Sequence, residues 1–425
     1  MRSILSAGIL DANRKSSTYF DIHLGKGDEI ADYTYNYAGD GVTVRTVGVM
    51  YYEGGERASA ASTEDCLIQQ DTHKIDTIGG ILDANRKSST YFDIHLGKGD
   101  EIADYTYNYA GDGVTVRTVG VMYYEGGERA SAASTEDCLI QQDTHKIDTI
   151  GGILDANRKS STYFDIHLGK GDEIADYTYN YAGDGVTVRT VGVMYYEGGE
   201  RASAASTEDC LIQQDTHKID TIGGILDANR KSSTYFDIHL GKGDEIADYT
   251  YNYAGDGVTV RTVGVMYYEG GERASAASTE DCLIQQDTHK IDTIGGILDA
   301  NRKSSTYFDI HLGKGDEIAD YTYNYAGDGV TVRTVGVMYY EGGERASAAS
   351  TEDCLIQQDT HKIDTIGGIL DANRKSSTYF DIHLGKGDEI ADYTYNYAGD
   401  GVTVRTVGVM YYEGGERASA ASTED

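Results

Sequence analysis

Residues 29–44 have the sequence EIADYTYNYAGDGVTV, in which a tyrosine-rich alternating stretch leads into a glycine turn and then into valines. Alternate residues from Ala31 to Tyr37 fall on one side of an extended chain, and the polar residues between them fall on the other. That period of two is typical of a β-strand. Residues 38–41 then predict a tight turn, because glycine adopts positive φ at little steric cost. The stretch therefore predicts an antiparallel β-hairpin.

The sequence on both sides continues this pattern. Residues 18–24 alternate and are rich in β-forming residues, so they predict a strand before a turn at residues 25–28. Residues 42–52 predict another strand. Its alternation changes phase between Val44 and Val47, which indicates a bulge or a strand buried on both faces.

The pattern is weaker further along. Residues 53–56 predict a turn, and residues 57–62 are small and polar. Residues 62–65 could cap a short helix over residues 66–68, or residues 66–68 could begin a strand. We favour a strand or loop there, and we expect one more short strand within residues 71–78.

This hairpin unit belongs to a 72-residue repeat that fills nearly the whole chain of 425 residues. The run that begins at Ile9 recurs without substitution at residues 81, 153, 225, 297 and 369. A leader of residues 1–8 precedes repeats 1 to 5 (9–80, 81–152, 153–224, 225–296 and 297–368), and residues 369–425 form an incomplete repeat 6. Because tandem repeats contact mainly their neighbours, we predict an all-β fold whose hairpins stack into one continuous spiralling sheet or solenoid-like array.

Charge and hydropathy limit the partners. The formal net charge is −34, and each complete repeat carries twelve acidic and six basic residues. Nucleic-acid binding needs lysine and arginine for the phosphates, so we expect no nucleic-acid partner. No apolar run is long enough to span a membrane, and residues 1–6 are too short for a secretory signal peptide. One cysteine per complete repeat is not a disulfide framework.

Three aromatic-polar pairs near glycines resemble a known repeat. Residues 35–39, Tyr-Asn-Tyr-Ala-Gly, resemble the core of the YD repeat, with Asn36 at the usual aspartate position. Residues 52–57 are similar, with Glu53 as the acidic residue, and Phe20 with Asp21 before Gly25 is a looser version. The resemblance implies the RHS/YD family of large bacterial secreted or surface proteins, whose hairpins join into a long spiralling sheet that can form a hollow shell. It implies an extracellular or cell-surface location.

The tyrosines are candidates for binding. Tyr33, Tyr35 and Tyr37 share a face, and three more tyrosines could lie nearby across the sheet: Tyr19, Tyr51 and Tyr52. Cross-strand aromatic packing accounts for such a stripe, and its pairs typically contribute a few tenths to about 1 kcal/mol. The alternative is a platform on which sugar rings or a partner surface stack, repeated along the array.

The acidic turns are weak candidates for calcium. Asp28, Glu29 and Asp32 cluster at one turn, and Asp40 lies between two glycines. Carboxylates on glycine-rich loops suit Ca²⁺, but neither an EF-hand loop nor the calcium-binding β-roll nonapeptide is present. Solvated acids at turns are the favoured interpretation, so we expect no metal and no cofactor.

His23, Cys66 and His73 could be imagined as zinc ligands, but no Cys-x-x-Cys pair or paired histidine spacing supports a site. We also expect no enzyme, because six identical units offer equal surfaces rather than one asymmetric catalytic site.

We therefore predict a structural protein that forms an extended rod, shell or filament. A polar cap normally closes a repeat array, and the two ends carry no evident cap, so we expect head-to-tail self-association. One alternative is a multivalent adhesin module that binds glycans or surface proteins. Another is a closed six-bladed β-propeller.

Overall fold

A computed structural model describes residues 14–37, 41–279, 281–350, 353–383 and 389–421. Within them lies a single 23-stranded β-sheet. The helical elements of this part of the chain are three-residue 3-10 turns, such as η2 (Glu53–Gly55), η3 (Ile78–Gly80) and η4 (Asp83–Asn85). The predicted all-β fold is confirmed.

The first repeat contributes four strands: β1 (Ser16–Asp21), β2 (Ile30–Tyr37), β3 (Val44–Tyr52) and β4 (Leu67–His73). The strands expected at residues 29–37 and 42–52 are confirmed within two residues, and the strand expected to begin at residues 66–68 is present as β4, which extends to His73. The first strand ends at Asp21 rather than at residue 24, because the Asp21 carboxylate accepts the backbone N–H of His23 and turns the chain. The short strand expected within residues 71–78 is wrong, since β4 ends at His73 and residues 78–80 form η3.

The later repeats reproduce these strands. Repeat 2 contains β5 (Arg86–Asp93), β6 (Ile102–Tyr109), β7 (Val116–Tyr124) and β8 (Leu139–His145). Repeat 3 contains β9 (Arg158–Asp165), β10 (Ile174–Tyr181), β11 (Val188–Tyr196) and β12 (Leu211–His217). Repeat 4 contains β13 (Arg230–Asp237), β14 (Ile246–Tyr253), β15 (Val260–Tyr268) and β16 (Leu283–His289). Repeat 5 contains β17 (Arg302–Asp309), β18 (Ile318–Tyr325), β19 (Val332–Tyr340) and β20 (Leu355–His361). Repeat 6 contains β21 (Arg374–Asp381), β22 (Ile390–Tyr397) and β23 (Val404–Val409).

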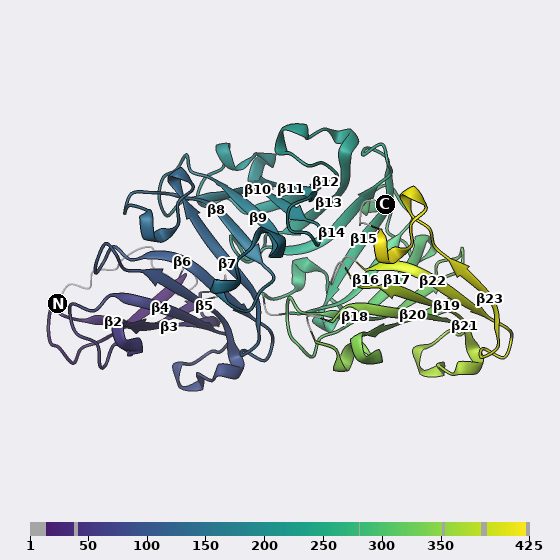
Figure 1. Ribbon diagram of the computed structural model, residues 1–425, viewed down its shortest axis with the longest axis horizontal. Coiled ribbons are helices and arrows are strands. Elements are labelled where there is room, and N and C mark those ends of the chain that lie inside the picture. The colour runs from purple at the N-terminus through teal and green to yellow at the C-terminus, as the bar shows by residue number, and fades with distance from the viewer. Residues whose placement is uncertain (1–13, 38–40, 280, 351–352, 384–388, 422–425) are drawn as a thin grey trace, which may run out of the picture.

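Each strand pairs antiparallel with its neighbour in sequence, so the sheet is an uninterrupted meander from β1 to β23. Figure 1 shows the strands following an arch, from β2–β5 beside the N-terminus, over β8–β14, to β18–β23 at the other end. Repeats join without a break, because the last strand of each repeat pairs with the first strand of the next, as β4 pairs with β5. The sheet is open and has no separate blades, which is not the architecture of a closed propeller.

Every strand pair contains one β-bulge. In the first four strand pairs, from β1–β2 to β4–β5, the register shifts leave one extra residue each: Asp32, Arg45, Ile68 and Lys87. The phase change expected between Val44 and Val47 is therefore a bulge at Arg45. Bulges bend a strand and increase its right-handed twist, so four in every repeat make the sheet coil instead of remaining flat.

One face of the sheet, here called the tyrosine face, carries Tyr33, Tyr35, Val47 and Val49, which lie opposite one another across β2 and β3. Both valines are fully buried, and burial of such a side chain stabilises the fold by about 1.5–3 kcal/mol. Part of the cover comes from the connection after β4, where the backbone N–H of Ile78 donates to the Tyr35 hydroxyl at 3.2 Å. On the opposite face Thr34 and Asn36 of β2 lie across from Gly48 and Thr46 of β3.

Small apolar clusters stabilise each repeat instead of one large core. In repeat 1, Ile30, Tyr52, Ala58 and Ala61 are buried together. The hydroxyl of Tyr52 donates to the Ala31 carbonyl at 2.5 Å, which ties the connection after β3 to β2. The same cluster recurs in repeats 2, 3 and 4. Such local cores agree with a solenoid, in which each unit is stabilised by itself and by its neighbours.

Coiling brings distant repeats into contact. Arg117 of repeat 2 pairs with Asp316 of repeat 5, 199 residues further along. Arg45 of repeat 1 pairs with Asp244 of repeat 4 at the same spacing. This spacing is a little under three repeats. We call the contact of repeats 1 and 2 with repeats 4 and 5 the seam.

No helix in the described ranges is long and apolar enough to cross a membrane.

Candidate functional site

Two tyrosines of the predicted stripe, Tyr33 and Tyr35, form a compact ring cluster with Tyr19, and the cluster recurs in every repeat. Tyr19 of β1 lies opposite Tyr33 of β2 and stacks on it, with ring centroids 4.8 Å apart and planes 12° apart. Tyr35 meets Tyr33 edge to face at 5.3 Å. Such pairs contribute about 0.5–1.5 kcal/mol beyond the area they bury. The same triads are Tyr91/Tyr105/Tyr107, Tyr163/Tyr177/Tyr179, Tyr235/Tyr249/Tyr251, Tyr307/Tyr321/Tyr323 and Tyr379/Tyr393/Tyr395.

The other three predicted tyrosines lie apart from this triad. Tyr37 lies under the guanidinium of Arg14, whose carbon is 4.2 Å from the ring centroid. Tyr51 lies near Arg57 at 6.0 Å. Tyr52 is 7% exposed in the apolar cluster, so a ligand cannot reach its ring in this conformation.

The central tyrosines of the triad are poor acids. Burial, together with the neighbouring Tyr109 and Asp71, raises the pKa of Tyr91 to about 12, and burial also raises the pKa of Tyr105. Tyr19 is more open than its counterparts because β1 lies at the edge of the sheet, and 43% of it is exposed. The triads therefore offer neutral aromatic faces and hydroxyl groups, which suit stacking and hydrogen bonding rather than proton transfer.

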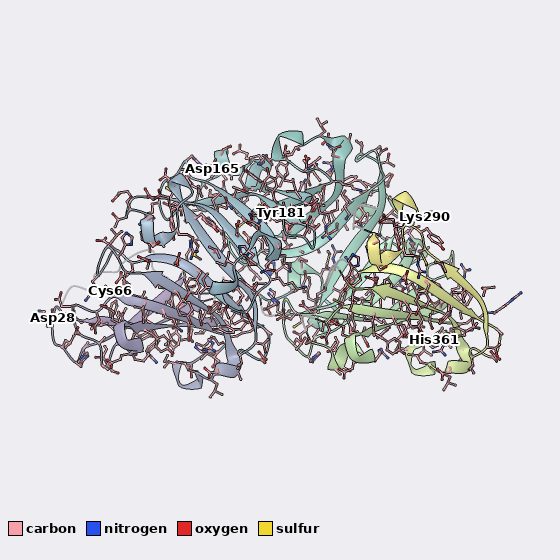
Figure 2. All side chains as sticks on the ribbon, viewed as in Figure 1. Asp28, Cys66, Asp165, Tyr181, Lys290 and His361 are labelled. Atoms are coloured by element: carbon pink, nitrogen blue, oxygen red, sulfur yellow. The ribbon has the colours of Figure 1, made fainter. Side chains whose placement is uncertain are left out.

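The acidic turn residues are already occupied by protein donors. Glu29 accepts the N–H of Gly27 at 3.1 Å, and this hydrogen bond lowers the pKa of Glu29. Asp32, the bulged residue of the first hairpin, pairs with Arg57 at 2.7 Å. Asp28 is exposed at the N-terminal end of the molecule (Figure 2).

Asp40 lies outside the described residues, but its counterpart Asp112 shows the local structure. Asp112 accepts the hydroxyl of Thr115 at 2.6 Å and two backbone N–H groups of the turn, and these bonds lower its pKa. Within the described residues, no three histidine, cysteine, aspartate or glutamate side chains are grouped to hold a metal ion.

The histidine and cysteine positions do not converge. His23 bonds to Asp21 through Nδ1 at 2.5 Å. Cys66 precedes β4 and His73 ends it, so they lie at opposite ends of one strand. Burial raises the pKa of the Cys66 thiol, which makes it a weak nucleophile.

A buried polar network at each junction between repeats was missed by the sequence analysis. Asp71 of β4 is 3% exposed and accepts the side-chain amide of Gln69 at 2.7 Å. Its other oxygen lies 3.6 Å from Arg86 of the next repeat. The Arg86 guanidinium lies over the Tyr109 ring at 4.4 Å, and the Tyr109 hydroxyl bonds to the buried Ser89 at 3.2 Å.

This network joins two repeats with charge-assisted bonds that only one register satisfies. Tyr181, labelled in Figure 2, is the Tyr109 equivalent of the next junction and bonds to Ser161 at 3.1 Å. Little in the sequence signals this network, because the stretch LIQQDTH places polar residues on both faces of the strand. The arrangement can fix the register of successive repeats, and its groups face one another instead of solvent.

Comparison with protein-family models gives no match, and no curated protein matches the chain.

Proposed function

We propose that this chain is a structural repeat protein whose continuous sheet forms an extended, coiled β-wall. The observation that carries the proposal is the uninterrupted meander of 23 strands, to which each complete repeat adds four. Two classes of contact hold the coil: the polar network between neighbouring repeats and the ion pairs of the seam. Multiplying one rigid unit in this way builds length and curvature, which are the properties of a scaffold.

Solution scattering on chains with different numbers of repeats tests the proposal. A coiled wall predicts that the largest dimension grows in equal steps as complete 72-residue repeats are added. A particle whose largest dimension does not change with repeat number would contradict it. Circular dichroism on each chain checks that the added repeats are folded.

The resemblance of the hairpins to YD repeats supports the finer proposal of a bacterial surface or secreted location. Fractionation of a native host, with antibody detection on intact cells, tests that location. Signal from intact cells or culture medium would support it, and signal confined to the cytosol would overturn it.

We also propose self-association between copies. If β1 of one copy paired with β23 of another, the contact would join two strand types that are not paired in any described repeat, because a strand of the β4 type lies between them. The seam residues offer a route to self-association that does not need this pairing. Asp28 and Arg333 are exposed, whereas their equivalents Asp244 and Arg117 form seam ion pairs.

Sedimentation velocity at increasing concentration tests this association. Arg261 and Arg333 are the exposed equivalents of the seam arginines Arg45 and Arg117. If replacing both exposed arginines with glutamate weakens the assembly, the seam route is supported. A monomer at every concentration would contradict self-association.

The repeated tyrosine triads favour multivalent binding of glycans or a protein surface as a second function. Neutral rings spaced one repeat apart present the same contact several times, which favours avidity. Glycan-array binding that Tyr33→Ala and Tyr19→Ala weaken, with unchanged thermal unfolding, would support this function. Unchanged binding, or loss of folding, would assign the triads to packing.

A further inference from the structure

The seam encloses a cavity of about 610 Å³. One wall comes from repeats 1 and 2, at the ends of β3, β5 and β7, and the other comes from the connections around β14 and β18 of repeats 4 and 5. The cavity depends on coiling, because its two walls are about 200 residues apart in sequence. It is separate from the tyrosine triads.

The charge of this cavity is opposite to that of the chain. Six basic side chains line it: Arg45, Lys74, Arg86, Lys87, Arg117 and Lys314. Three acidic side chains line it: Asp244, Glu245 and Asp316. Over the whole chain, by contrast, 70 acidic residues outnumber 36 basic ones. The excess of positive charge is therefore local and is created where the two turns meet.

The three carboxylates already have donors within the protein. Asp244 and Asp316 form ion pairs with the seam arginines, Arg45 and Arg117. Glu245 accepts the backbone N–H groups of Leu211 and Gly243 at 3.0 Å each. Arg86 pairs with Asp71 at the repeat junction, so lysines make up the remaining basic lining, and basic side chains outnumber acidic ones around the cavity.

The lysines come from both walls. Lys314 of repeat 5 donates to the Thr279 carbonyl, and an ammonium group has three donors, so it can bind a further acceptor. The Nζ atom of Lys74 crosses the seam and lies 3.6 Å from the place that a Cβ of Gly313 would take. The Lys74 ammonium therefore lies close to the backbone of the opposite wall.

We propose that the seam cavity binds a compact anion carrying at least two phosphate groups, of the pyrophosphate kind. Two groups are needed because the cations are distributed over both walls of a cavity much larger than one phosphate. Arginine and lysine bind phosphate oxygens by charge-assisted hydrogen bonds, which strengthen in a partly enclosed site. The bound anion would join repeats 1 and 2 to repeats 4 and 5 and stabilise the coil.

The identical repeats supply a matched control. Lys74 and Lys146 occupy equivalent positions, and each lies within electrostatic range of a cysteine of the opposite turn, Cys282 and Cys354 respectively. Lys290 has the same local sequence, does not line the cavity and lies in the C-terminal half of the molecule (Figure 2). Equal substitutions at the two sets of positions change the net charge equally.

Isothermal titration of the full chain with pyrophosphate, at fixed ionic strength, tests the proposal. The seam variant is Lys74→Ala with Lys87→Ala, two side chains that line the cavity. The control variant is Lys290→Ala with Lys303→Ala, the equivalent positions three repeats further along. We expect saturable binding to the unaltered chain, a loss of affinity of about tenfold or more in the seam variant, and a change under about twofold in the control.

A third variant separates charge from folding. Arginine at positions 74 and 87 keeps the charge, so it should keep the binding that alanine removes. Thermal unfolding without ligand compares the stability of all variants. Absence of saturable binding to the unaltered chain, or equal weakening in the seam and control variants, would overturn the proposal.

Discussion

Repeats of identical sequence occupy two different environments in this molecule. In the seam, the side chains of Asp244 and Asp316 are 8% and 11% exposed and each pairs with an arginine. Their equivalents Asp28 and Asp100 are exposed to solvent. The arginines show the same contrast, but here the residue of the earlier repeat lies in the seam. Arg117 is partly buried there, whereas its equivalent Arg333 is exposed.

This difference separates two levels of folding. The hairpins, bulges and apolar clusters recur in repeats inside and outside the seam, so they follow from local sequence and from contacts with adjacent repeats. The seam follows from the curvature that accumulates over nearly three repeats. Identical residues therefore provide internal controls, because a substitution can be placed where the seam exists or where it does not.

The largest effect we predict is a loss of stability at acidic pH, and it concerns buried histidines in repeats inside and outside the seam. His145, His217, His289 and His361 are at most 2% exposed, and burial lowers the pKa of each imidazole. The unfolded chain protonates near the ordinary pKa of 6.5, whereas the folded chain resists protonation. The stabilisation that the buried neutral imidazoles provide is therefore complete above pH 6.5. It is lost as the pH falls towards the lower pKa values of the folded chain.

Urea unfolding at pH 7.5 and pH 5 measures this loss. The midpoint should fall on acidification, and replacement of the four histidines by asparagine should reduce the fall. An equal fall in the two chains would contradict the assignment to these imidazoles.

The next effect distinguishes the seam from the rest. A Cβ on Gly111 would overlap the carbonyl oxygen of Leu312 across the seam, whereas one on Gly255, its equivalent in repeat 4, meets nothing within 4 Å. We expect Gly111→Ala to destabilise the chain by about 1–3 kcal/mol through overpacking. Gly255→Ala should be neutral or stabilising by up to about 1 kcal/mol. Urea midpoints of the two variants compare them, and equal midpoints would contradict the seam.

A smaller effect concerns the seam ion pairs. Arg117→Ala leaves the carboxylate of Asp316 without its arginine, at a cost of about 1–3 kcal/mol. Arg333→Ala removes an exposed arginine and should change stability by under about 0.5 kcal/mol. Thermal unfolding measures both. Adding Asp316→Ala to Arg117→Ala should restore part of the loss, and strictly additive losses would mean that the two side chains do not interact.

Much of the fold could be predicted from the sequence. Alternation and the glycine turns located three strands of each repeat, and the phase change between Val44 and Val47 located the bulge at Arg45. The end of β4 could not be predicted, because residues 74–78 have the same mixed composition as the strand before them. Spacing placed Tyr33 and Tyr35 on one face, but it also placed Tyr37 there, and the bulge at Arg45 shifts the register just before Tyr37. Tyr52 was expected beside that face, whereas it is buried in the apolar cluster with Ile30.

The seam was beyond prediction for a physical reason. Each bulge adds a small change of direction, and the contact between Arg45 and Asp244 depends on the sum of such changes over many strands. No short sequence pattern encodes that sum. Apart from the adjacent Arg86 and Lys87, the basic residues that line the cavity are far apart along the chain, so no basic patch is visible in the sequence.

The most direct test of the coil is a pair of spin-label distances. Val42→Cys in repeat 1 with Lys242→Cys in repeat 4 places labels beside the ion pair of Arg45 with Asp244. The control pair is Val258→Cys, the repeat 4 equivalent of Val42, with Lys26→Cys, the repeat 1 equivalent of Lys242. Serine at the five native cysteines removes other labelling. The coil predicts a short distance for the first pair and a long one for the second, and similar distances for the two pairs would contradict it.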